Sequence, residues 1–571
     1  MVLDDGLPTA TSRDQAELER RVVQIYAKDY GDGYDPQDPD LVLNRKAHAK
    51  YLAGGLGELP SGFISLDASR TWIVYWIVHS LELLGEPLPA EPDRRSIIDF
   101  LASCQHPDGG FGGGPYQLAH LAPTYAAVAA LVTLGGPDAL SVVDRPKLHA
   151  YLLRMCVPPQ RGGGMTMNEG GEVDVRGCYC ALAACEMLGL DKQAIADACG
   201  MVDFIRRCQS HEGGVGGEPW NEAHGGYSFC GLAAAALLGK AHEALDLDRF
   251  LRWAVRCQGS LEGGFAGRTA KLVDGCYSFW QGGAFPILAD LLRQQQAAQP
   301  AGAAAQSAAT GLRAAAAAAR PAAAGAASSG SSGGGAATPD AVVAARLSKL
   351  LLGEVPEGSD GDASPLADDP GREPSLAEWV GDLPKLTPLA AVERRQAELQ
   401  AQLDAAVEAS LDAEEQYRAV AGRAAGGPLQ QEALAALDRA ADLQKELESC
   451  QQHGEARRFG TSTLLAAVPP PEPLPLEGGR ERLPQLYDAR ALQLWLLKCC
   501  QTPPRGGLRD KPGKAADYYH TCYCLSGLSS SQHYSGVVLG GQQNLLAPAD
   551  PLCNVGAAKL EAARRHFAAQ Q

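Results

Sequence analysis

The segment formed by residues 263–280 carries the richest mixture of reactive side chains in the sequence. It holds a glycine turn, two cations, a carboxylate, a thiol, a phenol and an indole, a mixture for which a purely structural segment has little use. Its short Asp-Gly-Cys turn allows Asp274 and Cys276 to reach one metal ion, and both side chains are zinc ligands. Three further side chains are donors suited to phosphate oxygens: Arg268, Lys271 and Tyr277.

Phe279 and Trp280 add apolar faces next to these polar groups. A metal site, an anion site and an apolar wall together indicate a reaction on an amphiphilic phosphate ester. Taken alone, an Asp-x-Cys pair is a weak metal signal, because most such pairs bind no ion.

A repeat surrounds this segment: an apolar helical stretch ends in Cys-Gln and is followed by a glycine turn. The copies lie at Cys104, Cys208, Cys257 and Cys500, with a degenerate copy at Cys156. The copies at Cys104, Cys156, Cys208 and Cys257 recur at intervals of roughly fifty residues, as stacked supersecondary units do. Two helices fit between consecutive turns, for example 226–238 and 245–257. The sequence therefore predicts an all-α stack of helical pairs, which either closes into a ring around a central cavity or stays open as a protein-binding solenoid.

Similar clusters follow other turns. Residues 222–230 place His224 and Tyr227 at a helix start, where free backbone N–H groups favour an anion. Residues 174–180 and 510–523 carry further acids, cations, tyrosines and thiols. The residues of these clusters also have purely structural interpretations. His520 would be a core histidine, the tyrosines would be packing residues, and Arg176 would form a salt bridge to Asp174. Only their recurrence after successive turns favours one shared cavity.

The repeat stops after residue 292 and resumes near residue 482. We therefore expect two parts of one helical domain, 1–292 and 482–571, separated by an insertion at 293–481. The insertion begins with a stretch rich in Ala, Gly and Ser, and residues 386–452 have the pattern of a helical hairpin. A further helix is expected at 18–30.

The chain has 571 residues, 46% of them hydrophobic and 20% charged, as in soluble globular proteins. The net charge of −17 argues against nucleic-acid binding. The 16 cysteines are scattered and several lie in apolar helical patterns, which predicts reduced thiols. With a polar N-terminus and no apolar run of spanning length, we expect a cytoplasmic protein without stable membrane insertion.

Several segments resemble the β subunits of protein farnesyltransferase, in the CaaX prenyltransferase family. The longest matching motifs are Leu-Val-Asp-Gly-Cys-Tyr-Ser-Phe-Trp at 272–280 and Tyr-His-Thr-Cys-Tyr-Cys-Leu-Ser-Gly-Leu at 519–528. Others are Leu-Asp-Ala-Ser-Arg at 66–70 and His-Leu-Ala-Pro-Thr-Tyr at 120–125. The resemblance covers about residues 15–292 and 482–570, and it implies an α/α toroid.

The resemblance implies that Asp274, Cys276 and His520 bind one Zn²⁺, which leaves a position for the cysteine thiol of a C-terminal CaaX tail. That thiol would attack farnesyl diphosphate, with Tyr277 and Lys271 also catalytic. Asp510 matches a carboxylate proposed to hold Mg²⁺. The family works as a heterodimer, which implies an α subunit as partner.

The resemblance also assigns substrate contacts. The diphosphate would contact His224, Arg268, Lys271, Tyr277 and Lys514. The isoprenoid would lie along Trp72, Arg176, Tyr179, Tyr227, Cys230 and Trp280. The CaaX tail would contact Ser69, Trp72, Trp76, His120, Ala122, Pro123 and Tyr519.

Trp72 bears on the choice within the family, since a bulky indole at the cavity floor should limit the lipid to fifteen carbons. A type I geranylgeranyltransferase β subunit, which has a small residue there, is the alternative in the same chemistry. A terpene cyclase is disfavoured because no Asp-x-Asp-Asp motif is present. A non-catalytic helical scaffold is the remaining alternative, and without the resemblance Trp72 and Trp76 would be read as a helical core stripe.

Overall fold

The computed structural model describes residues 9–27, 41–298, 401, 483 and 485–570. The described residues up to Gln294 and from Leu483 onward belong to one compact unit. Its longer helices are α1 (Ala10–Ala27), α2 (Arg45–Gly54), α3 (Arg70–Leu84), α4 (Arg94–Ser103), α5 (Leu121–Leu134), α7 (Arg145–Arg154), α8 (Val175–Leu188), α9 (Lys192–Ala198), α10 (Met201–Cys208), α11 (Gly225–Leu237), α13 (Leu247–Arg256), α15 (Ala284–Ala298), α23 (Tyr518–Ser535) and α24 (Ala557–Ala568).

Shorter elements connect them. They are η2 (Ser61–Ser69), α6 (Pro137–Leu140), η3 (Pro159–Arg161), α12 (Ala241–Ala244), α14 (Tyr277–Trp280), α22 (Ala489–Leu494), the π-helical η6 (Trp495–Cys500) and η7 (Gln542–Asn544). Two short strands, β1 (Leu508–Arg509) and β2 (Ala516–Asp517), pair antiparallel.

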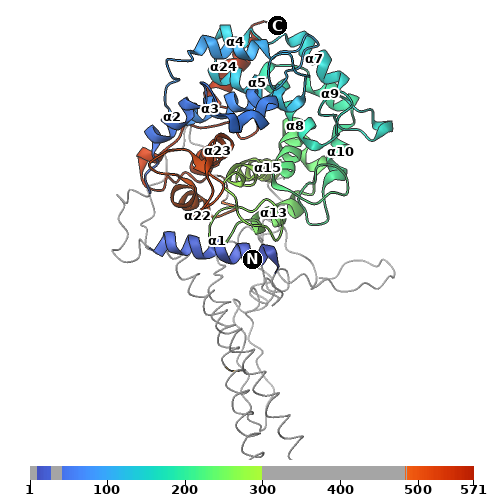
Figure 1. Cartoon of the computed structure of the whole chain (residues 1–571). Helices are drawn as coiled ribbons and strands as arrows, with labels where there is room; N and C mark the ends of the chain where they lie inside the picture. Colours follow the sequence, from blue (N-terminus) through green and yellow to red (C-terminus); the bar gives the residue numbers. More distant parts are fainter. Residues whose placement is uncertain (1–8, 28–40, 299–400, 402–482, 484, 571) are drawn as a thin grey trace, which may run out of the picture. The chain divides into compact units, whose positions relative to one another are not determined.

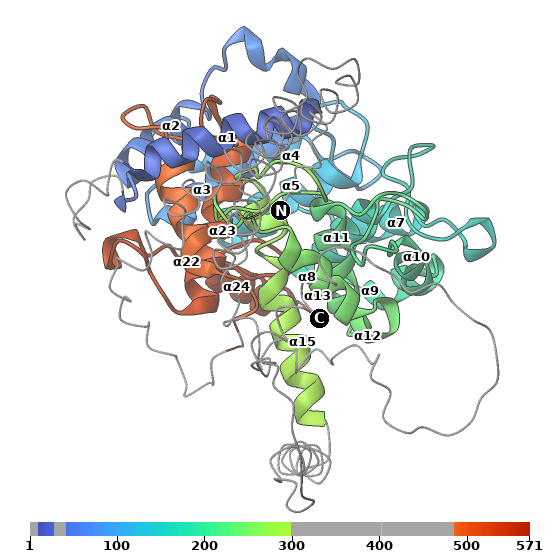
Figure 2. The same cartoon turned by 90° about the horizontal axis from the view of Figure 1, so that it is seen from below.

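Six inner helices close into a ring. In chain order they are α3, α5, α8, α11, α14 and α23; each contacts the next, and α23 contacts α3. Figures 1 and 2 show α23, in orange to red, beside α3, in blue, where the last of these helices meets the first. The ring confirms the expected α/α toroid and excludes the open solenoid.

Burial distinguishes the inner helices from the outer ones. Thirteen of the fourteen residues of α5 are buried, because this helix has neighbours in the ring on both sides and an outer helix behind it. The outer helix α13 instead buries five of its ten residues: Leu247, Phe250, Leu251, Trp253 and Ala254. All but Trp253 follow the i, i+3, i+4, i+7 spacing of an amphipathic helix.

Backbone hydrogen bonds join each inner helix to the loop of the next repeat. The first amides of these helices have no partner within the helix, so they need an acceptor outside it. The acceptors are carbonyls of the following glycine turn: Arg70 N donates to Gly113 O (2.8 Å), Leu121 N to Met167 O (2.7 Å), Val175 N to Gly217 O (2.9 Å), Gly225 N to Gly267 O (2.8 Å) and Gly275 N to Asp510 O (2.7 Å). The N-termini of the inner helices therefore lie at one end of the ring.

Glycine is required where these turns approach the helices. A Cβ added at Gly267 would lie 2.0 Å from Cζ of Tyr277, and one added at Gly113 would lie 1.7 Å from the carbonyl oxygen of Ala68. The glycine pairs of the sequence are thus explained by close packing between successive repeats.

The predicted helices at 226–238 and 245–257 are α11 and α13, with ends shifted by one or two residues. The helix predicted at 18–30 begins earlier, at Ala10. The reason is a local cap: Ser12 N donates to Thr9 Oγ1 (3.0 Å) and Thr9 N donates to Ser12 Oγ (2.9 Å).

α15 continues six residues past the boundary predicted at residue 292. The rest of the predicted insertion, and the hairpin at 386–452, lie outside the described residues apart from residue 401. None of the described helices combines the length and the apolar character needed to cross a bilayer. The fifteen cysteines in the described ranges are all free thiols.

Candidate active site

Residues at the starts of the inner helices supply the site. His120, Asp174, His224 and Asp517 are N-caps, and Asp274 lies two residues before Cys276, the N-cap of the short helix α14. The side chain of each accepts a backbone N–H group at the helix start. His120 Nδ1 accepts from Ala122 N (3.1 Å), Asp174 from Arg176 N (2.8 Å), His224 Nδ1 from Gly226 N (3.1 Å), Asp274 from Cys276 N (2.8 Å) and Asp517 from His520 N (2.7 Å). Because all these helix starts share one end of the ring, residues that are far apart in sequence converge there.

Asp274, Cys276 and His520, the zinc ligands that the resemblance implied, lie together and form a candidate metal-ligand cluster. One ligand atom from each lies within 4.8 Å of the other two. His520 Nε2 is 3.3 Å from Asp274 Oδ1, and Cys276 is only 3% exposed. A carboxylate, a thiolate and an imidazole are a donor set that suits zinc, and three protein ligands are typical of catalytic zinc sites.

Asp517, which was not among the predicted site residues, orients the histidine. Its Oδ2 lies 2.6 Å from His520 Nδ1, while its Oδ1 caps α23. This contact directs His520 Nε2 toward Asp274, the arrangement by which a carboxylate fixes a metal-binding imidazole. The signal in the sequence was Asp three residues before His at a helix start, where an N-cap is expected.

Gly275 allows the two ligands of the Asp-Gly-Cys turn to meet the third. A Cβ at this position would lie 2.6 Å from Cys524 Sγ and 2.7 Å from the Arg509 carbonyl oxygen. Its N–H donates to the carbonyl of Asp510 (2.7 Å), in the loop that precedes α23. The glycine thus brings residues 274–276 against the last repeat, which carries His520.

The three groups strongly affect each other's ionisation. Burial opposes the charge on Asp274, but His520 and the Cys276 N–H bring its pKa down to about 2. Burial likewise opposes the charge on His520, yet Asp274 and Asp517 raise its pKa to about 10. Burial and the Asp274 charge raise the pKa of the Cys276 thiol well above its usual value. Without a metal, His520 is therefore protonated and Cys276 is a thiol at neutral pH.

Asp274 lies on the wall of a cavity of about 540 Å³. All five residues predicted to contact a diphosphate line this cavity: His224, Arg268, Lys271, Tyr277 and Lys514. Asp510 and Lys511 also line it, and their side chains pair with each other. Arg268 pairs with Glu222 (2.8 Å), whereas no carboxylate in the described ranges pairs with Lys271 or Lys514.

α1, none of whose residues was a predicted site residue, forms part of the same wall. It contributes Asp14, Glu17, Leu18 and Arg21. The helix is anchored by Gln15, which donates to Glu262 Oε1 (2.7 Å), and by the buried Tyr26, which donates to the Glu262 carbonyl (2.8 Å). Figure 2 shows α1 lying across the end of the molecule near the orange C-terminal segment, where it contacts η6.

His224 and Tyr277 are hydrogen-bonded at 3.0 Å. Because His224 Nδ1 accepts from the Gly226 N–H, the neutral ring carries its proton on Nε2 and donates it to the Tyr277 oxygen. Burial and the nearby Arg268 charge lower the pKa of His224, which favours this neutral form. The Tyr277 O–H is then free to donate into the cavity.

Aromatic side chains of the inner helices form a closed belt. Adjacent ring centroids lie 4.5–5.8 Å apart in the order Trp76, Trp72, Tyr125, Tyr179, Phe229, Trp280, Tyr523, Tyr519 and back to Trp76. Five of these were predicted site residues, while Tyr125, Phe229 and Tyr523 were not. They could have been found from their position in successive helices of the repeat.

The remaining predicted residues lie near the starts of these helices. Arg176 pairs with Asp174 (2.6 Å), as its structural interpretation expected, and its guanidinium lies 5.7 Å from the Tyr227 ring centroid. Cys230 and Pro123 are buried, while Ser69, His120 and Ala122 are partly exposed.

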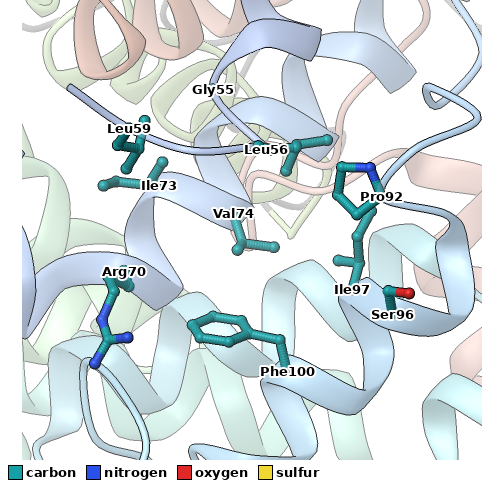
Figure 3. Close-up of a pocket in the computed structure, with 11 residues that line it drawn as sticks. Gly55, Leu56, Leu59, Arg70, Ile73, Val74, Pro92, Ser96, Ile97 and Phe100 are labelled. Atoms are coloured by element: carbon teal, nitrogen blue, oxygen red, sulfur yellow. The ribbon is translucent and has the colours of Figure 1, made fainter.

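A second cavity, of about 270 Å³, lies away from this site (Figure 3). Val74 and Ile73 of α3, Ile97 and Phe100 of α4, and the loop after α2 surround it. None of the predicted site residues lines it, so we treat it as a gap between outer and inner helices.

Comparison with known proteins identifies the family. The family model described as the prenyltransferase alpha-alpha toroid domain matches residues 43–555. The protein farnesyltransferase subunit beta of Arabidopsis thaliana is 33% identical over 96% of this chain and 87% of its own length, and that of Pisum sativum is 34% identical over 96% and 94%. The structure of Candida albicans protein geranylgeranyltransferase-I complexed with GGPP shares the fold, with a TM-score of 0.50 and 15% identity over 92% of this chain and 99% of that one. The chain therefore belongs to the prenyltransferase α/α-toroid family and, within it, to the β subunits of protein farnesyltransferase.

Proposed function

We propose that this chain transfers the farnesyl group of farnesyl diphosphate to the cysteine thiol of C-terminal CaaX tails, as one half of a heterodimer with an α subunit. The main support for the proposal is that three features lie together. The cluster Asp274–Cys276–His520 borders a cavity lined by cations, and both lie at the end of a ring with an aromatic interior.

The cluster fits Zn²⁺, and Asp274, Cys276 and His520 would hold it. When bound, zinc lowers the pKa of a coordinated substrate thiol, so that a thiolate is present at neutral pH. Asp517 keeps the imidazole oriented for this role through its 2.6 Å contact with Nδ1.

The reaction forms a bond between the substrate sulfur and C1 of the isoprenoid, while the C1–O bond breaks and its electron pair leaves with the diphosphate. Negative charge grows on the leaving oxygens, and donors fixed in advance stabilise it best. Arg268 is held by Glu222, and Tyr277 receives a hydrogen bond from His224, so both donors are positioned beforehand. Lys271 and Lys514 supply further positive charge, and Asp510 would hold a Mg²⁺ ion on the diphosphate.

The aromatic belt supplies the lipid site, with Trp72, Tyr179 and Trp280 along the isoprenoid and Arg176, Tyr227 and Cys230 beside it. Trp72 packs against Trp76 and Tyr125, with centroids 5.8 and 5.6 Å away, so its indole has little room to move aside for a longer chain. We therefore favour the fifteen-carbon farnesyl group over the twenty-carbon geranylgeranyl group.

The CaaX tail would enter beside Ser69, Trp72, Trp76, His120, Ala122, Pro123 and Tyr519. Tyr519 accepts a hydrogen bond from Trp280 Nε1 (3.0 Å), which links this wall to the lipid site. We assign the reaction to the cytoplasm, where reduced thiols such as those of this chain persist.

The test is co-expression with an α subunit, followed by transfer assays with farnesyl and geranylgeranyl diphosphates and several CaaX peptides. We expect zinc-dependent thioether formation with the fifteen-carbon donor preferred. The Trp72→Thr variant should shift preference toward the longer donor, whereas Trp253→Phe, on the outer helix α13, should not. Preference of the wild type for geranylgeranyl diphosphate would contradict the choice of lipid, and absence of transfer with both donors would contradict the function.

A further inference from the structure

Glutamine side chains join helices that lie outside the inner ring. Each of these glutamines forms a one-residue antiparallel bridge with the glycine turn that follows it, and its Oε1 accepts the backbone N–H of a residue that N-caps another such helix. We call this contact a glutamine clamp. The four clamps are Gln105 with Asp144 (3.2 Å), Gln209 with Asp246 (2.9 Å), Gln258 with Asp488 (3.0 Å) and Gln501 with Asn44 (3.0 Å).

The repeat that ends with α7 has two thiols in place of the clamp. Cys156 forms the corresponding bridge, with Met165, so it occupies the position of the glutamine. Its Sγ lies 3.6 Å from the carbonyl oxygen of Ile195, in α9. The Sγ of Cys199, which directly precedes Gly200, the N-cap of α10, lies 3.2 Å from the same oxygen. The two sulfurs thus meet where the other repeats place a glutamine and a helix cap.

The two thiols differ in exposure and in ionisation. Cys156 is the only one of the fifteen cysteines in the described ranges that is not buried, whereas Cys199 is fully buried. A hydrogen bond from the Cys199 thiol lowers the pKa of Cys156 despite its partial burial, and the same contact, together with burial, raises the pKa of Cys199. The thiolate is the form that reacts with oxidants, so an accessible thiol of lowered pKa beside a second thiol is typical of redox-sensitive cysteine pairs.

A second pair of neighbouring thiols differs from this one in exposure. Cys500 and Cys524 also share a hydrogen bond, but both are fully buried, and burial raises the pKa of Cys524 well above its usual value. Because an oxidant in solution reacts first with accessible thiolates, we expect Cys500 and Cys524 to remain thiols when Cys156 reacts.

We propose that Cys156 and Cys199 are a redox modification site, at which a peroxide converts the two thiols into a reversible disulfide. The Cys156 thiolate attacks one oxygen of hydrogen peroxide, the O–O bond breaks, and the departing hydroxide takes up a proton and leaves as water. Cys156 is then a sulfenic acid. The Cys199 sulfur attacks the Cys156 sulfur, the S–O bond breaks, and the hydroxide leaves as water with the Cys199 proton.

A dithiol reductant reverses the reaction and is itself oxidised to a disulfide. In a compartment that keeps thiols reduced, such a disulfide forms only transiently. It would be a covalent clamp between the end of α7 and the start of α10, in place of the glutamine clamp. Neither cysteine lines the 540 Å³ cavity, so the modification site does not depend on the proposed function.

The experiment treats the full chain, purified in complex with an α subunit and freed of reductant, with hydrogen peroxide. Free thiols are then blocked with N-ethylmaleimide in denaturant, and the peptides are measured by mass spectrometry. We expect the Cys156 and Cys199 peptides to be joined with the loss of two hydrogens, and to separate again after dithiothreitol, while Cys500 and Cys524 carry the blocking group. The oxidised protein should melt a few degrees above the reduced protein, because a cross-link restricts the unfolded chain.

Two variants keep the test independent of folding defects. Cys156→Gln restores the side chain that four other repeats carry at this position, so it should fold, and peroxide should leave its melting temperature unchanged. Cys199→Ala removes only the second thiol, so Cys156 should stop at the sulfenic acid and be trapped by dimedone in higher yield than in wild type.

The proposal is overturned if Cys156 and Cys199 both remain thiols under conditions that fully oxidise free glutathione, or if Cys500 and Cys524 are joined first. It is also overturned if dimedone traps Cys156 equally in wild type and in Cys199→Ala. An equal rise in melting temperature in Cys156→Gln would overturn it as well, because other thiols would then be responsible.

Discussion

The loop before α23 and the loop before α11 share a backbone course but carry different side chains. Six and three residues before the N-cap, the first has Lys511 and Lys514, whereas the second has Glu218 and Asn221. The loop before α14 resembles the first, with Arg268 and Lys271 six and three residues before Asp274. The two cationic loops border the metal-ligand cluster, and they line the 540 Å³ cavity. The chemistry of this ring therefore depends on what each repeat places at a few fixed positions.

The acceptors at the helix starts differ in the same way. On the metal side they are Asp274 and Asp517, whereas His120, Asp174 and His224 occupy the equivalent positions in the other repeats. All five accept a backbone N–H, but only Asp274 and Asp517 also contact His520. In the last two repeats an acceptor for the helix start is thus combined with the candidate metal site, whereas the acid Asp174 pairs with Arg176 instead.

The contrast between the two sides of the ring would be contradicted most clearly if the proposed metal ligands could be replaced without loss of zinc or of transfer. We expect Asp274→Ala, Cys276→Ala and His520→Ala each to lose bound zinc and to reduce transfer by more than roughly 100-fold, since removal of a ligand should cost more than removal of its supporting residue. Helix content by circular dichroism should stay near that of wild type. Zinc measured by atomic absorption at one ion per chain in any of these variants would contradict the assignment.

Asp517→Ala should have the next largest effect. The substitution removes the acceptor for His520 Nδ1 and the cap of α23, and we expect zinc affinity to fall roughly 10- to 100-fold, as for other residues that support a metal ligand. Asp174→Ala is the matched control, because it removes the equivalent cap from α8 at a position that does not contact the cluster. Equal losses of zinc affinity in both variants would show that Asp517 acts only through helix capping.

Lys271→Ala should weaken binding of farnesyl diphosphate by about tenfold, the order of a hydrogen bond to a charged group. Gln117→Ala alters the same loop position in the repeat before α5, and there we expect no change in the affinity for the diphosphate. Titration calorimetry with farnesyl diphosphate measures both. A loss of similar size in the glutamine variant would indicate that the loops act through their fold and not through their charge.

Much of this site could be predicted from the sequence, because it is built from features that are local in the chain. The Cys-Gln and glycine-turn repeat predicted stacked helical pairs. The recurrence of polar clusters after the turns predicted a shared cavity, and three of the four clusters line it, whereas residues 174–180 do not. The assignment of His520 to the cluster came from the resemblance, since 243 residues separate it from Cys276 and nothing local links them.

What escaped prediction depends on contacts between distant segments. α1 borders the cavity through its packing on Glu262, and no pattern in residues 10–27 indicates that neighbour. Tyr125 and Phe229 join the aromatic belt only because the ring closes. The start of α1 was missed for a smaller reason, because the Thr9–Ser12 cap precedes the apolar stripe that marked the helix.

The smallest effect that we expect is on the titration of the histidines, and it has opposite signs on the two sides of the ring. Burial lowers the pKa values of His120 and His224, and their Nδ1 atoms already accept backbone N–H groups. Below pH 6.5 the unfolded chain binds protons that these folded side chains resist, so their contribution to stability falls as the pH falls. His520, with a pKa of about 10, contributes stability that is fully present below pH 6.5 and is lost as the pH rises through 10.

In metal-free protein at pH 8, NMR of labelled histidines should therefore show His520 protonated and His120 and His224 neutral. Addition of zinc should release the His520 proton, because a metal ligand must be neutral, while the other two signals keep their protonation state. Gln is the matched substitution for assignment, since His520→Gln should remove only the signal that responds to zinc. If all three histidines titrate together near pH 6.5, the carboxylates of Asp274 and Asp517 do not set the protonation of His520, and the electrostatic difference between the two sides of the ring is absent.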